Sequence, residues 1–272
     1  MILVNGEVNT TVSCQDRGLQ FGDGLFETIA VLNGEIMHWS KHWQRLAAGC
    51  ERLFIPAPDE AILVNEIHSL LDNLQQQVIK LIVTRGVSER GYKFEDIKPT
   101  RIMIRSAWPE YNLQNAEEGI ELYLCKTRLA HQPLLAGLKH LNRLENILAR
   151  HEWQSDKFAE GLMCDLNGLV IEGTMSNIFV VKNGKLKTPN LSHCGVAGIT
   201  RQRILEAAEK ENIAVEVCEI SKDYLLEADE IFICNSLIGI WPVKKIAAHY
   251  FETGNGVNSM TRLLQQKINL GV

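Results

Sequence analysis

The chain has 272 residues, with 28 lysines and arginines against 33 aspartates and glutamates, so its formal net charge is −5. Hydrophobic residues make up 46% of the sequence and charged residues 22%, a balance that is typical of a folded globular protein and excludes a disordered chain, a collagen and a coiled coil. The acidic balance, without a cluster of lysine and arginine, argues against nucleic acid as the main partner.

Four Asn-Gly pairs, each between short apolar stretches, predict tight hairpins. Both central residues of a type I′ turn need a positive φ angle, which asparagine and glycine tolerate best. Two pairs lie in each half of the chain: Asn5-Gly6, Asn33-Gly34, Asn167-Gly168 and Asn183-Gly184. The sheets should therefore be largely antiparallel. A fifth pair, Asn255-Gly256, lies in a polar stretch and predicts only a loop.

Helical periodicity alternates with strand patterns along the chain. Helices are expected over 40–54, with Ser40 as N-cap, and over 59–74, followed by strands 78–85 and 101–107. The later elements are strand 119–126, helices 142–154 and 200–210, strands 213–219, 229–234 and 240–246, and helix 259–269. Segment 108–118 has little periodicity. It predicts a linker between a small N-terminal domain, 1–107, and a larger C-terminal domain, 119–272, in an α+β fold.

The sequence shows no pattern typical of a membrane span, a signal peptide, a disulfide framework or a metal site. No apolar run approaches the ~20 residues of a membrane span, and the first ten residues lack the features of a signal peptide. We therefore expect no membrane partner. The seven cysteines are widely spread and form no CxxC pair, which favours reduced thiols and a cytoplasmic location. The eight histidines show no zinc-binding spacing, so we expect no metal.

Lys139 is the first candidate for chemistry. Leucines at 134, 135, 138 and 141 surround it, and partial desolvation would make its amine a nucleophile suited to a Schiff base. Taken alone, the pattern fits a lysine that snorkels from a strand end at least as well.

Two further features could bind an anion. Gly198-Ile199-Thr200 precedes a helix, whose first N–H groups attract phosphate, although a plain threonine-assisted helix start gives the same pattern. Arg45, on helix 40–54, offers a fork that matches phosphate oxygens, or is one more charge on a solvated helix face.

The remaining candidate site residues are polar residues that lie beside predicted strands or in a loop. Glu172 could hydrogen-bond to a pyridinium nitrogen or simply flank a turn. Asn235 and Ser236 end an apolar strand, where polar groups serve as caps or ligand contacts. Arg90 and Tyr92, in a polar loop, could bind a carboxylate or belong only to the loop.

The ordered set of motifs resembles one enzyme family. FGDGLFET (21–28), Arg45 in HWQRL, Lys139 in KHLNRLEN, Glu172 in EGTMSNIF, GITR (198–201) and CNS (234–236) are similar to the fold-type IV pyridoxal-phosphate enzymes. That family contains branched-chain aminotransferases, D-amino acid aminotransferases and aminodeoxychorismate lyases. GLKHLNRLEN, RGY at 90–92 and ADEIFICNSL at 228–237 most resemble the lyases.

The resemblance implies a two-domain homodimer that holds pyridoxal phosphate in the cleft between the domains. It implies a Schiff base on Lys139 and a pairing of Glu172 with the pyridine nitrogen. It places the phosphate at Arg45, at the backbone N–H groups of Ile199 and Thr200, and at the hydroxyls of Thr200 and Ser236, with Asn235 as a further cofactor-binding residue. Arg90 and Tyr92 would contact a substrate carboxylate, and the Thr28 hydroxyl would face the cofactor and help in proton transfer.

The implied reaction is the elimination that converts 4-amino-4-deoxychorismate to para-aminobenzoate and pyruvate in folate biosynthesis. Phe26 stands where several aminotransferases carry tyrosine, and Leu237 and Ile238 replace more polar residues, so the pocket should suit a ring substrate. An aminotransferase for D-amino or branched-chain acids is the alternative. A non-catalytic protein that keeps the fold would be expected to lose Lys139 or Glu172, and both are present.

Overall fold

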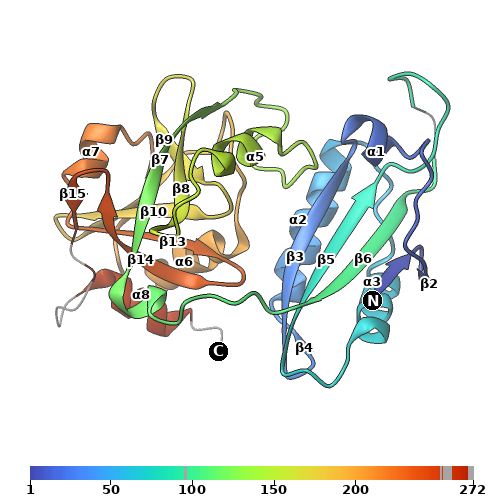
Figure 1. The fold of residues 1–272 in the computed structure, drawn as a ribbon, viewed down its shortest axis with the longest axis horizontal. Coiled ribbons are helices and arrows are strands. Elements are labelled where there is room, and N and C mark those ends of the chain that lie inside the picture. Colours follow the sequence, from blue (N-terminus) through green and yellow to red (C-terminus); the bar gives the residue numbers. More distant parts are fainter. Residues whose placement is uncertain (95–96, 252, 254–258, 269–272) are drawn as a thin grey trace. The chain divides into compact units, whose positions relative to one another are not determined.

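The computed structural model describes residues 1–94, 97–251, 253 and 259–268. The chain divides into two compact units, one formed by Met1–Glu110 with Leu138–Asn142 and the other by Tyr111–Gly137 with Arg143–Val272. Residues 138–142, which the sequence places in the C-terminal domain, therefore group with the first unit. Both units combine sheet and helix, as expected of an α+β chain (Figure 1).

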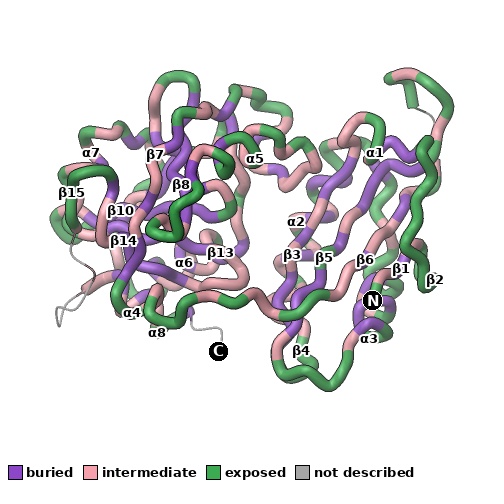
Figure 2. Tube along the Cα trace, in the orientation of Figure 1, coloured by how far each residue is buried: buried purple, intermediate pink, exposed green. Residues whose placement is uncertain are grey.

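An antiparallel sheet forms the centre of the first unit, in the strand order β2-β1-β6-β5-β3-β4. Its strands are β1 (Ile2–Val4), β2 (Glu7–Val8), β3 (Gly24–Leu32), β4 (Glu35–Ile36), β5 (Gln76–Thr84) and β6 (Thr100–Ala107). Its helices are α1 (Arg17–Phe21), α2 (Trp39–Arg52) and α3 (Glu60–Leu70). Strands β3 and β5 are largely buried, whereas the β1–β2 hairpin is largely exposed (Figure 2).

Strand β3 separates two environments because successive side chains point to opposite faces. Leu25 packs toward Gly49 of α2, and Glu27 contacts α2 through ionic hydrogen bonds. Phe26 and Thr28 therefore point to the other face of the sheet, where both are half-buried. This alternation decides which side chains of the first unit can act together.

The second unit contains the larger sheet. Its strands are β7 (Ile120–Leu129), β8 (Phe158–Asp165), β9 (Val170–Gly173), β10 (Asn177–Lys182), β11 (Lys185–Pro189), β12 (Val215–Cys218), β13 (Glu230–Asn235), β14 (Gly239–Ile246) and β15 (His249–Tyr250). Its helices are α4 (Asn115–Glu118), α5 (Leu144–His151), α6 (Ile199–Lys210), α7 (Lys222–Leu226) and α8 (Met260–Lys267).

Six strands of this sheet close into a ring. They run in the order β10-β13-β14-β7-β8-β9, and a pairing of Glu172 with Asn177 joins β9 back to β10. One apolar cluster lies among these strands, and a second, with the stacked rings of Phe179 and Phe232 at 5.1 Å, packs against α6 and α8. Among the described pairings between named strands, only β7–β8, β7–β14 and β11–β12 are parallel, so the largely antiparallel expectation is confirmed.

The Asn-Gly pairs give three hairpins of the expected kind. Asn5, Asn33 and Asn183 all have positive φ angles, as do the glycines that follow them. The fourth hairpin forms differently, and the type I′ expectation for Asn167-Gly168 is wrong. Asp165 accepts hydrogen bonds from the N–H groups of Asn167 and Leu169, which builds a longer loop in which only the glycine has a positive φ. Asn255-Gly256 lies outside the described residues.

The predicted helices and later strands are found with shifted ends. Ser40 is not the N-cap of α2, because the chain turns at His38, whose φ of 55° places the helix start one residue earlier. Helices α1, α4 and α7 were not predicted from the sequence. They have only five, four and five residues, too few to show a helical periodicity. Within the described part of the chain, no helix has the length and apolarity to cross a membrane.

Candidate active site

Lys139 lies on a short extended segment that runs beside β3 in the first unit. Its carbonyl accepts a hydrogen bond from the Phe26 N–H at 2.9 Å, and the Leu141 N–H donates to the Gly24 carbonyl at 3.0 Å. The Lys139 amine lies 4.3 Å from the centre of the Phe26 ring. Backbone pairing therefore fixes this lysine, and its amine shares the sheet face with Phe26 rather than extending freely from a strand end.

A second lysine, which sequence reasoning missed, approaches the same ring. Lys80 lies opposite Thr28 in the register of β3 with β5, and its amine is 5.4 Å from the Phe26 ring centre. Lys139, Lys80, Phe26 and Thr28 thus form one polar and aromatic face. The alternation of VIKLIVTR could place Lys80 on a strand, but not beside Lys139.

Arg45 lies on the α2 side of the sheet, away from the Phe26 face. Its Nε and Nη2 atoms donate to both oxygens of Glu27, at 2.8 and 2.5 Å, and His42 Nδ1 lies 2.6 Å from the same carboxylate. Burial alone would raise the pKa of Glu27, but the Arg45 charge and the hydrogen bonds from His42 and Arg45 lower it to about 2. This buried carboxylate holds the Arg45 fork in place, and a phosphate contact by Arg45 stays a prediction.

Arg90 and Tyr92 lie on an exposed loop that Arg17 anchors. The Arg17 guanidinium donates to the carbonyl of Gly91 at 2.8 Å and to that of Tyr92 at 3.3 Å, while Asp23 holds it from the other side at 2.8 Å. Tyr92 is 84% exposed. The loop is thus fixed at its backbone and presents both side chains outward, and their contact with a substrate stays a prediction.

Glu172 is buried at the closure of the strand ring in the second unit. The Val196 N–H donates to its Oε2 at 2.8 Å, and Asn177 Nδ2 lies 3.5 Å from the same oxygen. Asn177 also donates to the Val196 carbonyl at 2.9 Å. Asn177 was part of the EGTMSNIF motif but was not singled out, because its orienting contact with Glu172 depends on strand pairing.

The start of α6 provides the expected group of backbone donors. Gly198 is the N-cap and makes no side-chain cap, and both Ile199 and Thr200 are only 2% exposed. Arg201 is directed away into the protein, with Nε 3.2 Å from the Thr188 hydroxyl. The first N–H groups of α6 have no partner within their own helix, as is usual for a helix start. Their contact with a phosphate, like that of the Thr200 hydroxyl, stays a prediction.

Asn235 organises the turn that carries Ser236. Its Oδ1 accepts hydrogen bonds from the N–H groups of Leu237 and Ile238, at 2.9 and 3.0 Å, and its Nδ2 donates to the Met175 carbonyl at 3.2 Å. The side chain is thus occupied in shaping the turn. Its direct contact with a cofactor, like that of Ser236, stays a prediction.

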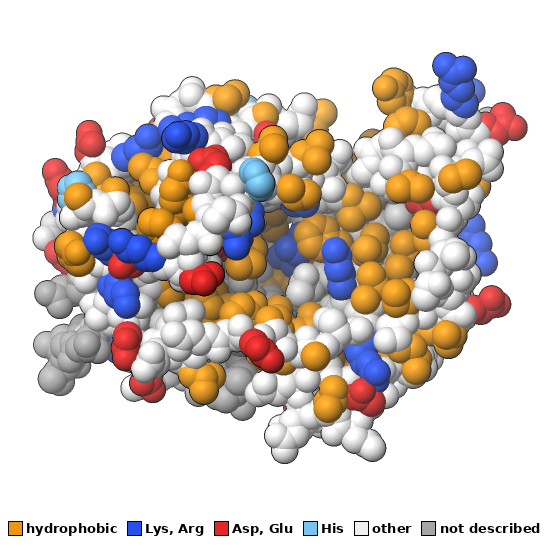
Figure 3. All heavy atoms as spheres, viewed as in Figure 1, with side chains coloured by type: hydrophobic (Ala, Val, Ile, Leu, Met, Phe, Trp, Pro, Cys, Tyr) orange, Lys and Arg blue, Asp and Glu red, His pale blue; other side chains and the backbone are white. Residues whose placement is uncertain are grey.

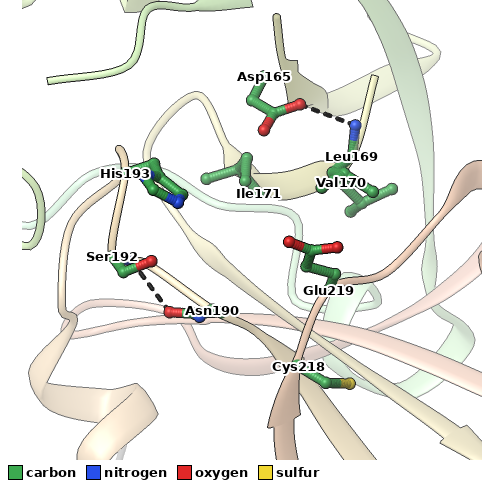
Figure 4. Close-up of a pocket in the computed structure, with 9 residues that line it drawn as sticks. All are labelled: Asp165, Leu169, Val170, Ile171, Asn190, Ser192, His193, Cys218 and Glu219. Atoms are coloured by element: carbon green, nitrogen blue, oxygen red, sulfur yellow. Dashed lines mark hydrogen bonds between the residues drawn. The ribbon is translucent and has the colours of Figure 1, made fainter. Parts of the chain in front are cut away.

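A small pocket elsewhere in the second unit lies beside Asp165 and His193 (Figure 4). Its volume is about 20 Å³, room for about one water molecule. None of the predicted site residues lines it, although Ile171 precedes Glu172 in the chain. It is too small for a cofactor or a ring substrate.

Comparison with known proteins places these residues in a family. The sequence matches the family described as amino-transferase class IV over residues 24–246. It is 38% identical to the aminodeoxychorismate lyase of Vibrio harveyi, covering 99% of this chain and 100% of the relative, and 34% identical to a putative branched-chain-amino-acid aminotransferase of Methanocaldococcus jannaschii, covering 98% and 94%. The crystal structure of 4-amino-4-deoxychorismate lyase from Pseudomonas aeruginosa matches with a TM-score of 0.95 and 44% identity over 100% of both chains. The chain belongs to the amino-transferase class IV family.

Proposed function

We propose that the protein is a pyridoxal-phosphate-dependent lyase that converts 4-amino-4-deoxychorismate to para-aminobenzoate and pyruvate, as a step of folate biosynthesis. The observation that carries this proposal is the full-length similarity to lyases, at 38% and 44% identity. The similarity to a putative branched-chain aminotransferase is lower, at 34%. An aminotransferase on the same fold is the second candidate.

The residues of both units fit pyridoxal phosphate chemically. Glu172 is a buried carboxylate suited to a protonated ring nitrogen, and the α6 start offers N–H donors without a competing side-chain cap. Lys139 supplies the primary amine that the cofactor's aldehyde requires. When bound, the cofactor withdraws electrons from the carbon that carries the substrate's amine.

The protein's own groups would then handle two protons. The Lys139 amine takes the proton from the amine-bearing ring carbon as a general base. The bond between the neighbouring ring carbon and the enolpyruvyl oxygen breaks, and the ring becomes aromatic. Thr28 or Lys139 delivers a proton to the departing enol carbon, which yields pyruvate. The atoms of the substrate divide completely between the two products, so the reaction needs neither an oxidant nor a keto-acid acceptor.

This balance gives the test that separates the two candidates. We expect a higher kcat/KM for the aminodeoxychorismate reaction without an acceptor than for transamination of D-alanine or leucine with 2-oxoglutarate. Transamination that exceeds the lyase reaction would favour the second candidate.

Lys80 should affect substrate binding more than turnover. The substrate carries two carboxylates, and Lys80 is an exposed cation on the face that holds Lys139 and Phe26. Lys80→Met is expected to raise KM roughly tenfold, equivalent to about 1.4 kcal/mol, with little change in kcat. Steady-state kinetics check this, with Lys185→Met on the exposed β10–β11 turn as control. An unchanged KM would remove Lys80 from the substrate site.

We also propose a homodimer. Helix α5 exposes three large apolar side chains, since Leu144, Ile147 and Leu148 are 73%, 62% and 60% exposed. Figure 3 shows hydrophobic side chains at the surface around α5. A contiguous apolar helix face of this kind is typical of a subunit interface.

Sedimentation equilibrium should give twice the 30.6 kDa mass of the chain. Leu148→Glu should shift the protein toward monomer, because dimerisation would bury the new charge. Val217→Glu, on half-exposed β12, is the matched control and should leave the mass unchanged. A monomeric wild type, or a Leu148→Glu variant that stays dimeric, would contradict this interface.

A cytoplasmic location is the further part of this proposal. All seven cysteines are free thiols in the structure, and a reducing compartment keeps them so. Fractionation of cells with an antibody to the protein tests the location.

A further inference from the structure

The second unit contains a buried carboxylate that the proposed chemistry does not use. Glu160 on β8 is 1% exposed. Its Oε1 accepts hydrogen bonds from the Gly161 N–H at 2.8 Å, from the Thr174 N–H at 3.1 Å and from the Thr174 hydroxyl at 2.5 Å. Its Oε2 accepts from the Met175 N–H at 3.2 Å and from the Ser176 hydroxyl at 3.0 Å. Four of these five donors belong to one loop.

That loop, residues 174–176, joins β9 to β10 beside Glu172 and Asn177, whose pairing closes the strand ring. The Gly173 N–H donates to the Ser176 carbonyl at 2.6 Å, so the loop is a tight turn. A Cβ atom on Gly173 would lie 2.2 Å from the Ser176 hydroxyl and 3.1 Å from Glu160. The loop therefore closes directly over the Glu160 carboxylate.

The same loop connects to the turn that carries Ser236. Its Met175 carbonyl accepts the Asn235 side-chain amide, whose oxygen in turn holds the N–H groups of Leu237 and Ile238. A second amide, from Asn146, donates to the Thr174 carbonyl at 3.0 Å. Glu160 therefore accepts hydrogen bonds from N–H groups of the loop, and Asn146 and Asn235 donate hydrogen bonds to carbonyl groups of the same loop.

We propose that Glu160 is a positioning residue that sets both the carboxylate for the ring nitrogen and the turn that carries Ser236. The inference rests on the proposed function, in which Glu172 pairs with the ring nitrogen of the cofactor, and on the predicted phosphate contact of Ser236. Glu160 acts through the loop: its two oxygens fix residues 174–176, the loop fixes the Glu172–Asn177 closure, and Met175 fixes Asn235. Buried groups that hold the contacting residues in this way commonly tune a site by as much as the contacts themselves.

Burial raises the pKa of the Glu160 carboxyl, while the hydrogen bonds from Thr174, Gly161, Ser176 and Met175 act in the opposite direction and favour the ionised form. All five groups around it are donors, and a carboxylate offers only acceptors. Glu160→Gln keeps the shape but turns one oxygen into an NH₂ group, and on either side of the carboxylate that group faces at least one backbone N–H donor. The variant should therefore displace the loop without leaving a cavity.

The experiment titrates pyridoxal phosphate into the apoprotein of each variant and measures its dissociation constant and the circular dichroism of the bound cofactor. Glu160→Gln is expected to raise the dissociation constant at least tenfold and to change the cofactor's circular dichroism. Glu152→Gln is the matched control. Its carboxylate also accepts two backbone N–H groups, from Lys126 at 2.6 Å and Thr127 at 2.7 Å, but it caps α5 and does not touch the loop. It should stay within twofold of wild type.

Ser176→Ala removes one hydrogen bond and keeps the proposal testable if Glu160→Gln does not fold. It should raise the dissociation constant by a smaller factor, about threefold. A Glu160→Gln or Ser176→Ala variant that binds the cofactor as wild type does, with unchanged circular dichroism, would overturn the positioning role. Failure of the wild-type protein to bind pyridoxal phosphate at all would instead overturn the proposed function.

Discussion

Replacing Lys139 with alanine is expected to lower the rate of para-aminobenzoate release by roughly 10⁴-fold or more, the upper range for loss of a general acid–base group. The variant loses the amine that holds the cofactor and the base that removes the ring proton in one change. Backbone pairing with β3 fixes Lys139, and its amine lies 4.3 Å from the Phe26 ring centre, whereas the Lys80 amine lies 5.4 Å away.

Chromatography of the products measures the loss of activity. Dialysis of the protein after loading with pyridoxal phosphate measures the loss of cofactor attachment. Dialysis should remove the cofactor from Lys139→Ala and leave it on wild type. Lys185→Ala, on an exposed hairpin, is the control and should keep both properties. Full lyase activity in Lys139→Ala would show that another group carries the chemistry.

Replacing Glu27 with glutamine is expected to lower the free energy of unfolding by about 3 kcal/mol at pH 7. Glu27 is 1% exposed and is held by Arg45 and His42. Its pKa falls from the ordinary 4.5 to about 2 in the folded protein. A difference of about 2.5 units corresponds to about 3 kcal/mol, and removal of one partner from a buried ion pair costs a similar amount.

The sign of the pH dependence follows from the lowered pKa. The folded state holds the ionised carboxylate more strongly than the unfolded state does, so its contribution is complete above about pH 4.5. It is lost progressively as the pH falls toward 2. Urea unfolding of the apoprotein at several pH values should show a shallower acid dependence for Glu27→Gln than for wild type.

Glu35→Gln, on an exposed position of β4, provides the control and should change stability by less than about 0.5 kcal/mol. Equal unfolding free energies for wild type and Glu27→Gln at pH 7 would mean that the cluster does not stabilise the fold.

The parts of the fold that depend on local chemistry could be predicted from the sequence. Asn5-Gly6 and Asn183-Gly184 form the expected turns, because both residue types tolerate positive φ angles and the turn closes as the dipeptide predicts. Asn167-Gly168 does not, because the carboxylate of Asp165 offers its N–H groups a competing arrangement. Similarly, the start of α2 is set by the turn at His38, which the helical pattern after Ser40 does not contain.

In the candidate site, too, some features follow from adjacent residues and others depend on residues that are distant in the sequence. The start of α6 was predictable because the glycine, the small residues and the helix are adjacent in the sequence. The pairing of Lys139 with β3 joins residues more than a hundred positions apart, and no local pattern specifies it. Lys80 was missed for this reason, since it meets its neighbours only when β3 and β5 pair. Glu160 faces the loop that follows the next strand, β9, and a hairpin pattern alone does not show which donors its carboxylate meets.

The central claim is tested most directly by supplying the wild-type protein with pyridoxal phosphate and 4-amino-4-deoxychorismate, without any keto acid, and measuring both products over time. The account predicts that para-aminobenzoate and pyruvate are released in equal amounts. Absence of both products, with pyridoxamine phosphate formed instead from D-alanine or a branched-chain amino acid, would contradict it and identify an aminotransferase.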